Sequence, residues 1–387
     1  MNVPNSVISK LGLGDEMREI YIHRFMYQLS KKLVAIFIPL YILDLGFSPL
    51  YVVGFFMAYF TSAMLSAFPS AVLSSRLGYK KTSLASCPLV LSYYFILRNM
   101  TGTTVELLAA ALIGGTGVTV YWMGMNPEVA KSSHRDKDDE EAGIFFSIPS
   151  ISSVIAPVIG AGILAVAGFE ILFTTTIGAI LLSFIPLALT PEHREGMNLK
   201  VREFISNYEL YDFLVFLTTG SSWVGQIVVW PLFLATILES AGIGGSGALL
   251  ALGGAVTSII AGFMSERIGR KNVLTFGAIT AAITFLAMSM VTSPVTAFIV
   301  STANGFFLKF VNIPIYGTVM EHSEDSDLIE YHMIREIGLN TGRIISMGIL
   351  VASFLLLPTE KAFLTGFILM AALSLLSVPV GWKMIDS

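Results

Sequence analysis

Long runs of apolar residues, separated by short polar stretches, make up most of the chain. A helix that crosses the hydrocarbon of a bilayer needs about 20 predominantly apolar residues. Twelve runs approach or meet that length, so the pattern predicts an all-α membrane protein with twelve transmembrane helices. The expected spans are residues 25–44, 49–70, 83–99, 104–127, 143–166, 171–190, 211–238, 246–264, 273–292, 295–319, 337–357 and 361–382.

The composition supports lipid as the main solvent. Hydrophobic residues make up 54% and charged residues 13% of the 387 residues, roughly half the charged fraction of an average soluble domain. Cys87 is the only cysteine, which excludes an intrachain disulfide and a thiolate metal cluster. The first 24 residues lack the short apolar core and cleavage site of a signal peptide, so we expect the first span to be retained.

The positive charges are unevenly distributed between alternate loops. Of the 23 Lys and Arg residues, 17 fall in the termini and in five alternate loops, 4 fall inside spans, and only Arg98 and Lys361 fall in the other loops. The five loops are residues 71–81, 128–142, 191–210, 265–272 and 320–336. Cytoplasmic loops carry an excess of Lys and Arg. The sequence therefore predicts a multi-pass protein of the cell membrane with both termini in the cytoplasm.

The two halves of the chain resemble each other at an offset of about 190 residues. This repeat predicts two pseudo-symmetric bundles of six helices around a central cavity, formed by residues 1–190 and 211–387. Residues 191–210 are polar and short, and we interpret them as a cytoplasmic linker. Repeats of this kind are typical of transporters, which bind their substrate between the repeats near the middle of the bilayer.

One loop motif occurs in both halves, complete at residues 262–271 and weaker at residues 71–81. The complete copy matches the signature Gly-x-x-x-Asp/Glu-Arg-x-Gly-Arg-Lys at Gly262, Glu266, Arg267, Gly269, Arg270 and Lys271. The weaker copy keeps Arg76, Gly78 and Lys80, but has Ala71, Ser75 and Tyr79 at the other matching positions. Through this motif and the twelve spans, the chain resembles the major facilitator superfamily of secondary transporters over essentially its whole length.

The resemblance implies that the motif loops belong to a cytoplasmic gate. Because Ser75 replaces the acid of the first copy, we expect Glu266 to take most of this role, by meeting the positive end of the helix that begins near Gly143. The other interpretation is that the cations of the loops only fix the topology. Residues 156–162 resemble in part a Gly-Pro-x-x-Gly-Gly element that is common in exporters of the family, although its small residues also suit close helix packing.

Four cations fall inside the expected spans: Lys31, Lys32, Lys309 and Arg343. A charge in mid-membrane is costly and normally faces a wet cavity or a partner. Lys31 and Lys32 could instead extend towards the cytoplasmic surface. For Lys309, we favour a function, because no acid is near it in the sequence.

Helical spacing places further polar and aromatic residues in stripes on spans one, four, seven and ten, which line the central cavity in the family that the chain resembles. The candidate cavity residues are Tyr27, Gln28, Lys31, Trp122, Asn126, Trp223, Gln226, Trp230, Lys309, Asn312 and Tyr316. The other interpretation is that the aromatic residues only pack between helices or lie at the interface. A further stripe on span eleven combines Glu336, Asn340 and Arg343, and we interpret it as part of the gate, with Asn340 bridging the other two. The candidate gate residues are thus Arg76, Gly78, Gly262, Glu266, Arg267, Gly269, Arg270, Glu336, Asn340 and Arg343.

These features predict a secondary transporter for a small organic solute, with proton-coupled export as the first hypothesis. No carboxylate is central in a span, since Asp44, Glu128 and Glu239 all fall near span ends, so coupling would use a peripheral acid or be absent. Uptake or facilitated diffusion of an anionic metabolite, held by Lys309 and Arg343, is the nearest alternative. A non-transporting sensor of the same fold is the next.

Motifs for other functions are missing from the sequence. It contains no Gly-x-x-x-x-Gly-Lys-Ser/Thr loop, no His-Glu-x-x-His and no Gly-x-Ser-x-Gly. We therefore expect neither an ATP-driven pump nor an enzyme, and no cofactor or metal. The expected partners are the solute, membrane lipid and protons, without nucleic acid, and we expect a monomer.

Overall fold

A computed structural model describes residues 15–132, 138–189, 191–194, 196, 209–324 and 327–387. Every regular element of this part of the chain is a helix. In the first half these are α2 (Asp15–Ala35), α3 (Ile38–Asp44), α4 (Pro49–Leu77), α5 (Tyr79–Arg98), α6 (Thr104–Ser132) and α7 (Asp138–Leu189). The second half has α9 (Glu209–Val224), a π-helical turn (Gly225–Val229), α10 (Trp230–Leu234), α11 (Ser240–Ile268), α12 (Arg270–Met288), α13 (Pro294–Glu324), α14 (Leu328–Leu356) and α15 (Thr359–Asp386).

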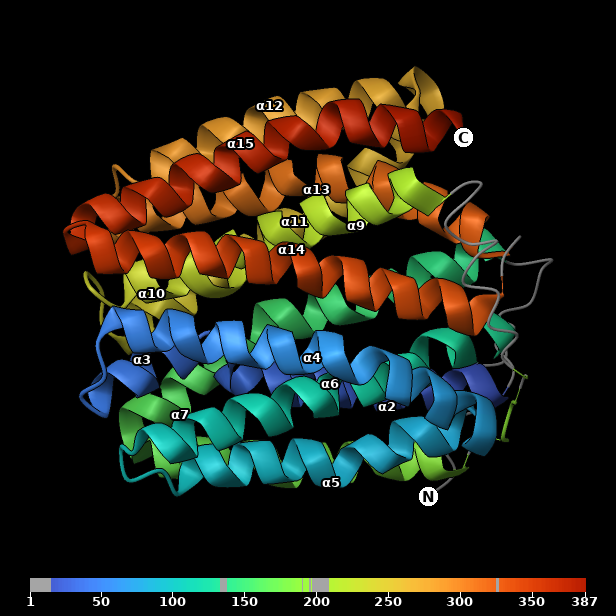
Figure 1. Cartoon of the computed structure of the whole chain (residues 1–387), viewed down its shortest axis with the longest axis horizontal. Coiled ribbons are helices and arrows are strands. Elements are labelled where there is room, and N and C mark those ends of the chain that lie inside the picture. Colours follow the sequence, from blue (N-terminus) through green and yellow to red (C-terminus); the bar gives the residue numbers. More distant parts are fainter. Residues whose placement is uncertain (1–14, 133–137, 190, 195, 197–208, 325–326) are drawn as a thin grey trace, which may run out of the picture.

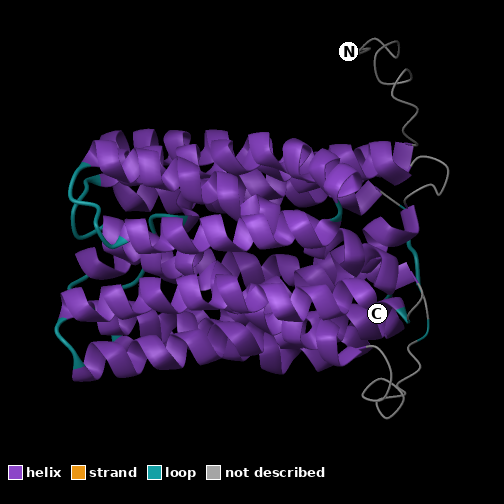
Figure 2. Ribbon diagram, turned by 90° about the horizontal axis from the view of Figure 1, so that it is seen from above, coloured by secondary structure: helices purple, strands orange, loops and turns teal. Residues whose placement is uncertain are grey.

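The long helices lie side by side, with the connections at two opposite ends (Figures 1 and 2). Ten of them, counted over the described residues, are long and apolar enough to cross a membrane. Large apolar side chains such as Val166, Ile259 and Leu356 are at least 79% exposed, which in water would be a liability and in lipid is the preferred state. The protein is therefore a helical multi-pass membrane protein, as the apolar runs predict.

The 52-residue helix α7 reverses direction at Gly168, where φ is 74° and ψ is −179°. Ser152, before the reversal, donates a hydrogen bond to the carbonyl of Phe25 near the start of α2. Ser183, after the reversal, accepts one from His23, also near the start of α2. Between them, Phe169 packs on Tyr41 at the far end of the first half. The chain thus travels the length of the bundle, turns at Gly168 and returns.

Prolines interrupt the first membrane-spanning segment of each half, α2–α3 in the first half and α9–α10 in the second. The chain of α2 breaks before α3, which has Pro39 at its start, and the chain of α9 passes through the π-helical turn before Pro231 in α10. Proline lacks an N–H group and collides with the preceding turn, so a regular α-helix cannot continue through it unchanged.

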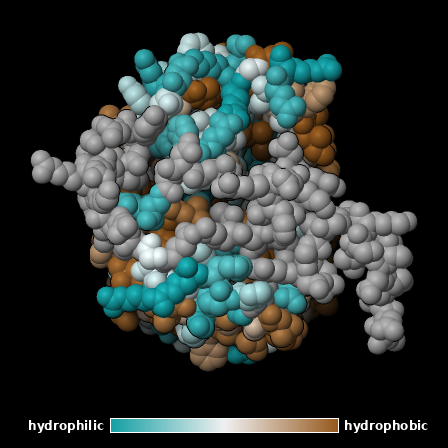
Figure 3. Space-filling model, turned by 90° about the vertical axis from the view of Figure 1, so that its right-hand side faces the viewer, coloured by the Kyte–Doolittle hydropathy of each residue, from teal (hydrophilic) through white to brown (hydrophobic). Residues whose placement is uncertain are grey.

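Within the described residues, the first half of the chain (residues 15–132 and 138–189) packs on the second half (residues 211–324 and 327–387) mainly through α4 on α14 and α7 on α11. We call the end of the molecule that holds Gly78 and Gly269 the motif end; Figure 3 looks onto it and shows hydrophilic side chains gathered there. Near this end, Ala67 and Ala71 of α4 pack with Met333 of α14. Towards the opposite end, α3 contacts α10. The halves therefore touch near both ends.

Candidate functional site

The two motif loops contain the same backbone turn. Gly78, between α4 and α5, has φ 97° and ψ 166°, and Gly269, between α11 and α12, has φ 86° and ψ 143°. Positive φ values of this size are accessible to glycine at low cost and are strained for other residues. By contrast, the first glycine of the complete motif, Gly262, lies within α11, and a Cβ atom there would contact nothing. The backbone conformation of the loops therefore requires glycine at positions 78 and 269, but not at position 262.

A glutamate from outside the motif caps the helix that follows Gly78. The Glu192 carboxylate accepts hydrogen bonds from the backbone N–H groups of Lys80 and Lys81, at 3.1 and 3.2 Å. These groups belong to the first turn of α5 and have no partner within the helix. The loss of an acid at Ser75 is thus offset at this turn by an acid 117 residues later. No local spacing in the sequence connects the two positions, so the sequence pattern does not predict this contact.

The residues next to Glu192 extend this contact. The carbonyl of His193 accepts a hydrogen bond from the backbone of Tyr79 (2.8 Å), and Arg194 donates one to the carbonyl of Ser75 (3.0 Å). The His193 ring is 3.3 Å from the carboxylate of the buried Glu128 at the end of α6. The start of the expected linker therefore packs on the motif end of the first half, while its residues 195 and 197–208 lie outside the described part of the chain.

The complete motif makes different contacts. Arg270 binds Glu321 of α13 through two hydrogen bonds, of 2.6 and 2.7 Å, and Lys271 pairs with Asp386 near the end of α15. The guanidinium of Arg267 lies 4.3 Å from the centre of the Phe263 ring. The contacts of Arg270 and Lys271 join helices of the second half, and the contact of Arg267 lies within α11. None of the three therefore connects the second half to the first.

The predicted latch residue Glu266 is exposed, and it forms no hydrogen bond or ion pair with any described residue. Its expected partner, the helix start near Gly143, lies in a stretch whose side chains are outside the described residues. Arg76 of the first copy is also exposed. The gating role of both residues stays a prediction.

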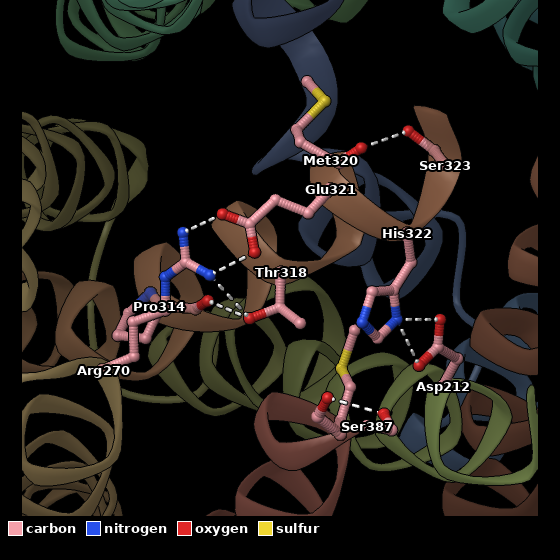
Figure 4. A network of polar contacts seen from close by, with 10 residues as sticks. Asp212, Arg270, Pro314, Thr318, Met320, Glu321, His322, Ser323 and Ser387 are labelled. Atoms are coloured by element: carbon pink, nitrogen blue, oxygen red, sulfur yellow. Dashed lines mark hydrogen bonds and ion pairs between the residues drawn. The ribbon is translucent and has the colours of Figure 1, made fainter. Parts of the chain in front are cut away.

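Asp212 in α9 belongs to a polar network at the motif end, and Figure 4 shows its contact with His322 of α13. Its carboxylate, 2% exposed, lies 2.9 Å from the His322 ring of α13 and accepts a hydrogen bond of 2.9 Å from the hydroxyl of Tyr331 in α14. The network therefore joins three helices of the second half. No local sequence pattern predicts this network, because Asp212 is 110 and 119 residues away from its two partners.

The stripe on α14 is partly arranged as the sequence predicts. Arg343 donates a hydrogen bond of 2.8 Å to the side chain of Asn340, which in turn donates one of 2.8 Å to the backbone carbonyl of Glu336. Asn340 thus bridges the two residues, although the Glu336 carboxylate itself pairs with Arg335 at 3.2 Å. The guanidinium of Arg343 also lies 5.2 Å from the ring of Phe60 in α4, so this stripe contacts the first half.

The candidate cavity residues of the first half form an aromatic group on α2 and α6. Tyr27 is fully buried and stacks on Tyr121, with ring centroids 4.0 Å apart, and the ammonium of Lys31 lies 5.2 Å from the centre of the Tyr27 ring. Trp122 faces the guanidinium of Arg24 at 5.7 Å. Among the candidates without such contacts, Gln28 is half-buried and Asn126 has a buried amide nitrogen with no hydrogen-bond partner in the described structure.

Five of the six candidates of the second half separate into two groups, and the sixth, Lys309, is half-buried on α13 in neither group. Trp223, Asn312 and Tyr316 line a cavity of about 40 Å³, together with Phe216, Thr219, Ile315, Val319, Arg335 and Leu339. In contrast, Trp230 is 1% exposed and donates a hydrogen bond to Ser301 (3.0 Å), and Gln226 donates one to Asn304 (2.7 Å). The structure thus brings the first group to a cavity and the second into contacts between α9–α10 and α13.

Comparisons with known proteins agree with this architecture. The family model described as Major Facilitator Superfamily matches residues 20–208 and 213–386, whereas no curated protein matches the chain.

Two solved structures share the fold at low sequence identity. The crystal structure of the nucleoside transporter NupG superposes with a TM-score of 0.69 at 13% identity, over 95% of this chain and 99% of that one. A POT family transporter in complex with 5-aminolevulinic acid superposes with a TM-score of 0.74 at 10% identity, over 95% of both chains. The chain therefore belongs to the major facilitator superfamily and is a multi-pass membrane transporter, not an enzyme.

Proposed function

We propose that the protein is a twelve-span secondary transporter that moves a small organic solute across the cell membrane by alternating access. Residues 1–190 and 211–387 form two six-helix bundles, joined by the linker at residues 191–210, and both termini face the cytoplasm. Proton-coupled export is the first form of this proposal. Uptake or facilitated diffusion is the second.

The count of twelve spans rests on α5 and α7. The span Ile151–Leu189 has 39 residues, almost twice what one crossing needs, and it reverses at Gly168. The 20 residues of α5 connect Gly78 at the motif end with Arg98, which pairs with Glu170 beside the reversal of α7. With α5 crossing once and α7 twice, the ten apolar helices become twelve crossings.

The observation that carries the proposal is that polar and aromatic side chains of the two halves approach each other. The guanidinium of Arg343 lies 5.2 Å from the ring of Phe60 in the first half and 5.4 Å from that of Trp223 in the second, and Arg24, which faces Trp122, interacts electrostatically with Tyr316. Tyr27 and Trp122 come from the first half, and Trp223, Asn312 and Tyr316 from the second. The cavity beside the latter group is about 40 Å³, whereas sites for small organic ligands have roughly 300–1,000 Å³. With the halves touching near both ends, the structure represents a closed conformation, and one end must open to admit a solute.

A candidate for proton coupling lies at the motif end. Asp212 and Glu128 are buried carboxylates, each close to a histidine, His322 and His193. Both are near span ends, in keeping with coupling through a peripheral acid. We propose Asp212 first, because its contacts reach α13 and α14 and therefore depend on how these helices are arranged.

Transport by purified protein in proteoliposomes tests the proposal. The panel of labelled solutes should include nucleosides and 5-aminolevulinic acid, which belong to the two structural neighbours, with organic acids and their neutral amides. We expect flux of at least one solute above that in protein-free liposomes, and a pH gradient should accelerate it. Flux that is the same with and without the pH gradient would exclude proton coupling. A solute that binds to the protein without any flux would favour the hypothesis of a non-transporting sensor.

A further inference from the structure

Three lysines lie in the middle of the membrane-spanning helices. Lys31 and Lys32 are near the centre of the span Glu19–Asp44, and Lys309 is near the centre of Pro294–Ser323. The hydrocarbon core is about 30 Å thick, so a mid-span residue is about 15 Å from either surface, farther than a lysine side chain reaches. The ammonium of Lys31 in fact lies against the ring of Tyr27, one helical turn away. Extension to the membrane surface therefore does not account for these lysines.

The lysines come together from the two halves of the chain. Lys32 interacts electrostatically with Lys31 on its own helix and with Lys309 of α13. Helix α11 lies between them: a Cβ atom on Gly254 would be 3.1 Å from Cε of Lys309. Two turns along the same face of α11, Gly247 lies against the side chain of Ile36, one turn from Lys32. The lysines of α2 and α13 thus approach each other beside α11.

No carboxylate neutralises this group in the described part of the chain. None of the three lysines forms an ion pair or a hydrogen bond there, whereas Arg270 and Lys271 at the motif end each pair with an acid. The neighbouring helix α7 has acids only in its first four residues and at Glu170, far from the level of Lys31. Like charges repel in a medium of low dielectric constant, and an intramembrane charge normally has a partner.

The lysines are accessible although protein surrounds them. The side chain of Lys32 is exposed and those of Lys31 and Lys309 are half-buried, while the protein desolvates all three. The three lysines are therefore partly accessible, although protein atoms surround them. Asn312, one turn from Lys309, lines the cavity beside Trp223 and has a buried side-chain oxygen without a hydrogen-bond partner among the described residues.

We propose that Lys31, Lys32 and Lys309 form the subsite for an anionic group, a carboxylate or a phosphate, of the transported solute. This inference rests on the proposed transport function and names its substrate class. The rest of the solute extends towards the aromatic group at Tyr27 or towards Asn312 and Trp223. Because the subsite combines lysines of both halves, the anion holds the halves together, and a solute without an anionic group does not. Arg343, which the sequence also suggested for this task, is already bound to Asn340.

Binding measurements on the purified full-length protein in neutral detergent test the proposal. The probes are organic monocarboxylates, dicarboxylates and phosphate monoesters, each paired with its neutral amide or alcohol. We expect a set of acids to raise the melting temperature, with the paired neutral compounds inactive. Whichever class raises the melting temperature more, the carboxylates or the phosphate monoesters, identifies the anionic group that the lysines bind. Equal stabilisation by acids and neutral analogues would overturn the proposal.

Lysine variants locate the site. Lys32→Gln and Lys309→Gln should each weaken binding of the most effective acid at least tenfold, whereas Lys309→Arg, which keeps the charge, should retain most of it. Lys383→Gln is the matched control, because Lys383 is exposed near the end of α15. Unchanged binding by folded Lys32→Gln and Lys309→Gln would place the anion elsewhere and overturn the proposal.

Flux separates this proposal from the proposed function. Transport of a neutral solute that persists in Lys309→Gln would leave the transport function intact and refute the anionic subsite. Lysine-dependent binding of an acid without flux would support the subsite and refute transport of that solute.

Discussion

Gly78 and Gly269 have nearly the same backbone conformation, with φ of 97° and 86°, although they are about 190 residues apart. Each ends one long helix and begins the next at the same end of the molecule. Their surroundings differ, because the side chain of Glu192 packs against Gly78, whereas a Cβ atom on Gly269 would contact nothing. The internal repeat is therefore preserved in the backbone and has diverged in the side chains.

Alanine at these turns should destabilise the protein to different extents. We expect Gly269→Ala to cost about 1 kcal/mol, because alanine is strained at positive φ. Gly78→Ala should cost more, because its methyl group must also displace Glu192. Gly262→Ala is the matched control and should be neutral or stabilising, since Gly262 is helical and has open space around it. Thermal unfolding in detergent measures all three, and equal losses would contradict the assignment.

The pair Arg270–Glu321 should contribute little to stability despite its short hydrogen bonds. The side chains are 33% and 61% exposed, and ion pairs of this kind contribute at most about 1 kcal/mol. A double-mutant cycle with Arg270→Gln and Glu321→Gln should give a coupling free energy of that size. Arg98–Glu170, similarly exposed at 28% and 69%, provides the comparison. A coupling free energy above about 2 kcal/mol would contradict this expectation, because it would require the ion pair to be more shielded from water than its exposure in the structure implies.

Asp212 should matter more for stability. Replacing it by Asn removes the charged acceptor of Tyr331 and His322 in a buried site, for which we expect a loss of about 1–3 kcal/mol. Tyr331→Phe removes the hydrogen bond to Asp212 and should cost about 1 kcal/mol. Tyr211→Phe, at the exposed neighbouring position, is the control and should leave the melting temperature unchanged. An Asp212→Asn protein as stable as the control would argue against a structural role of the network.

The latch hypothesis for Glu266 predicts an effect on accessibility. In a Cys87→Ser background, Met333→Cys places a reporter where α14 packs on α4 near the motif end. Glu266→Gln should increase its labelling by a membrane-impermeant maleimide at the cytoplasmic face, because the closed conformation loses a stabilising contact. Ser75→Ala, the corresponding position of the first copy, should have a smaller effect. Labelling that is the same in all variants would remove Glu266 from the gate.

Much of the architecture could be predicted from local sequence. The lengths of the apolar runs indicate membrane helices because the bilayer sets the length of a crossing. The glycine turns and the family motif follow from positive φ values that glycine alone tolerates well. The helical period also placed Glu336, Asn340 and Arg343 on one face, where the structure joins them.

The contacts between distant side chains required the tertiary structure. The capping of α5 by Glu192, the binding of His322 and Tyr331 to Asp212, and the approach of Lys32 to Lys309 each join residues more than 100 positions apart. Helical periodicity gives the face on which a residue lies, but the rotation and translation of one helix against another follow from packing of the whole bundle. The sequence alone thus determined the membrane helices, the turns and the family, and only the packed bundle decided which charges meet and which remain without a partner at its centre.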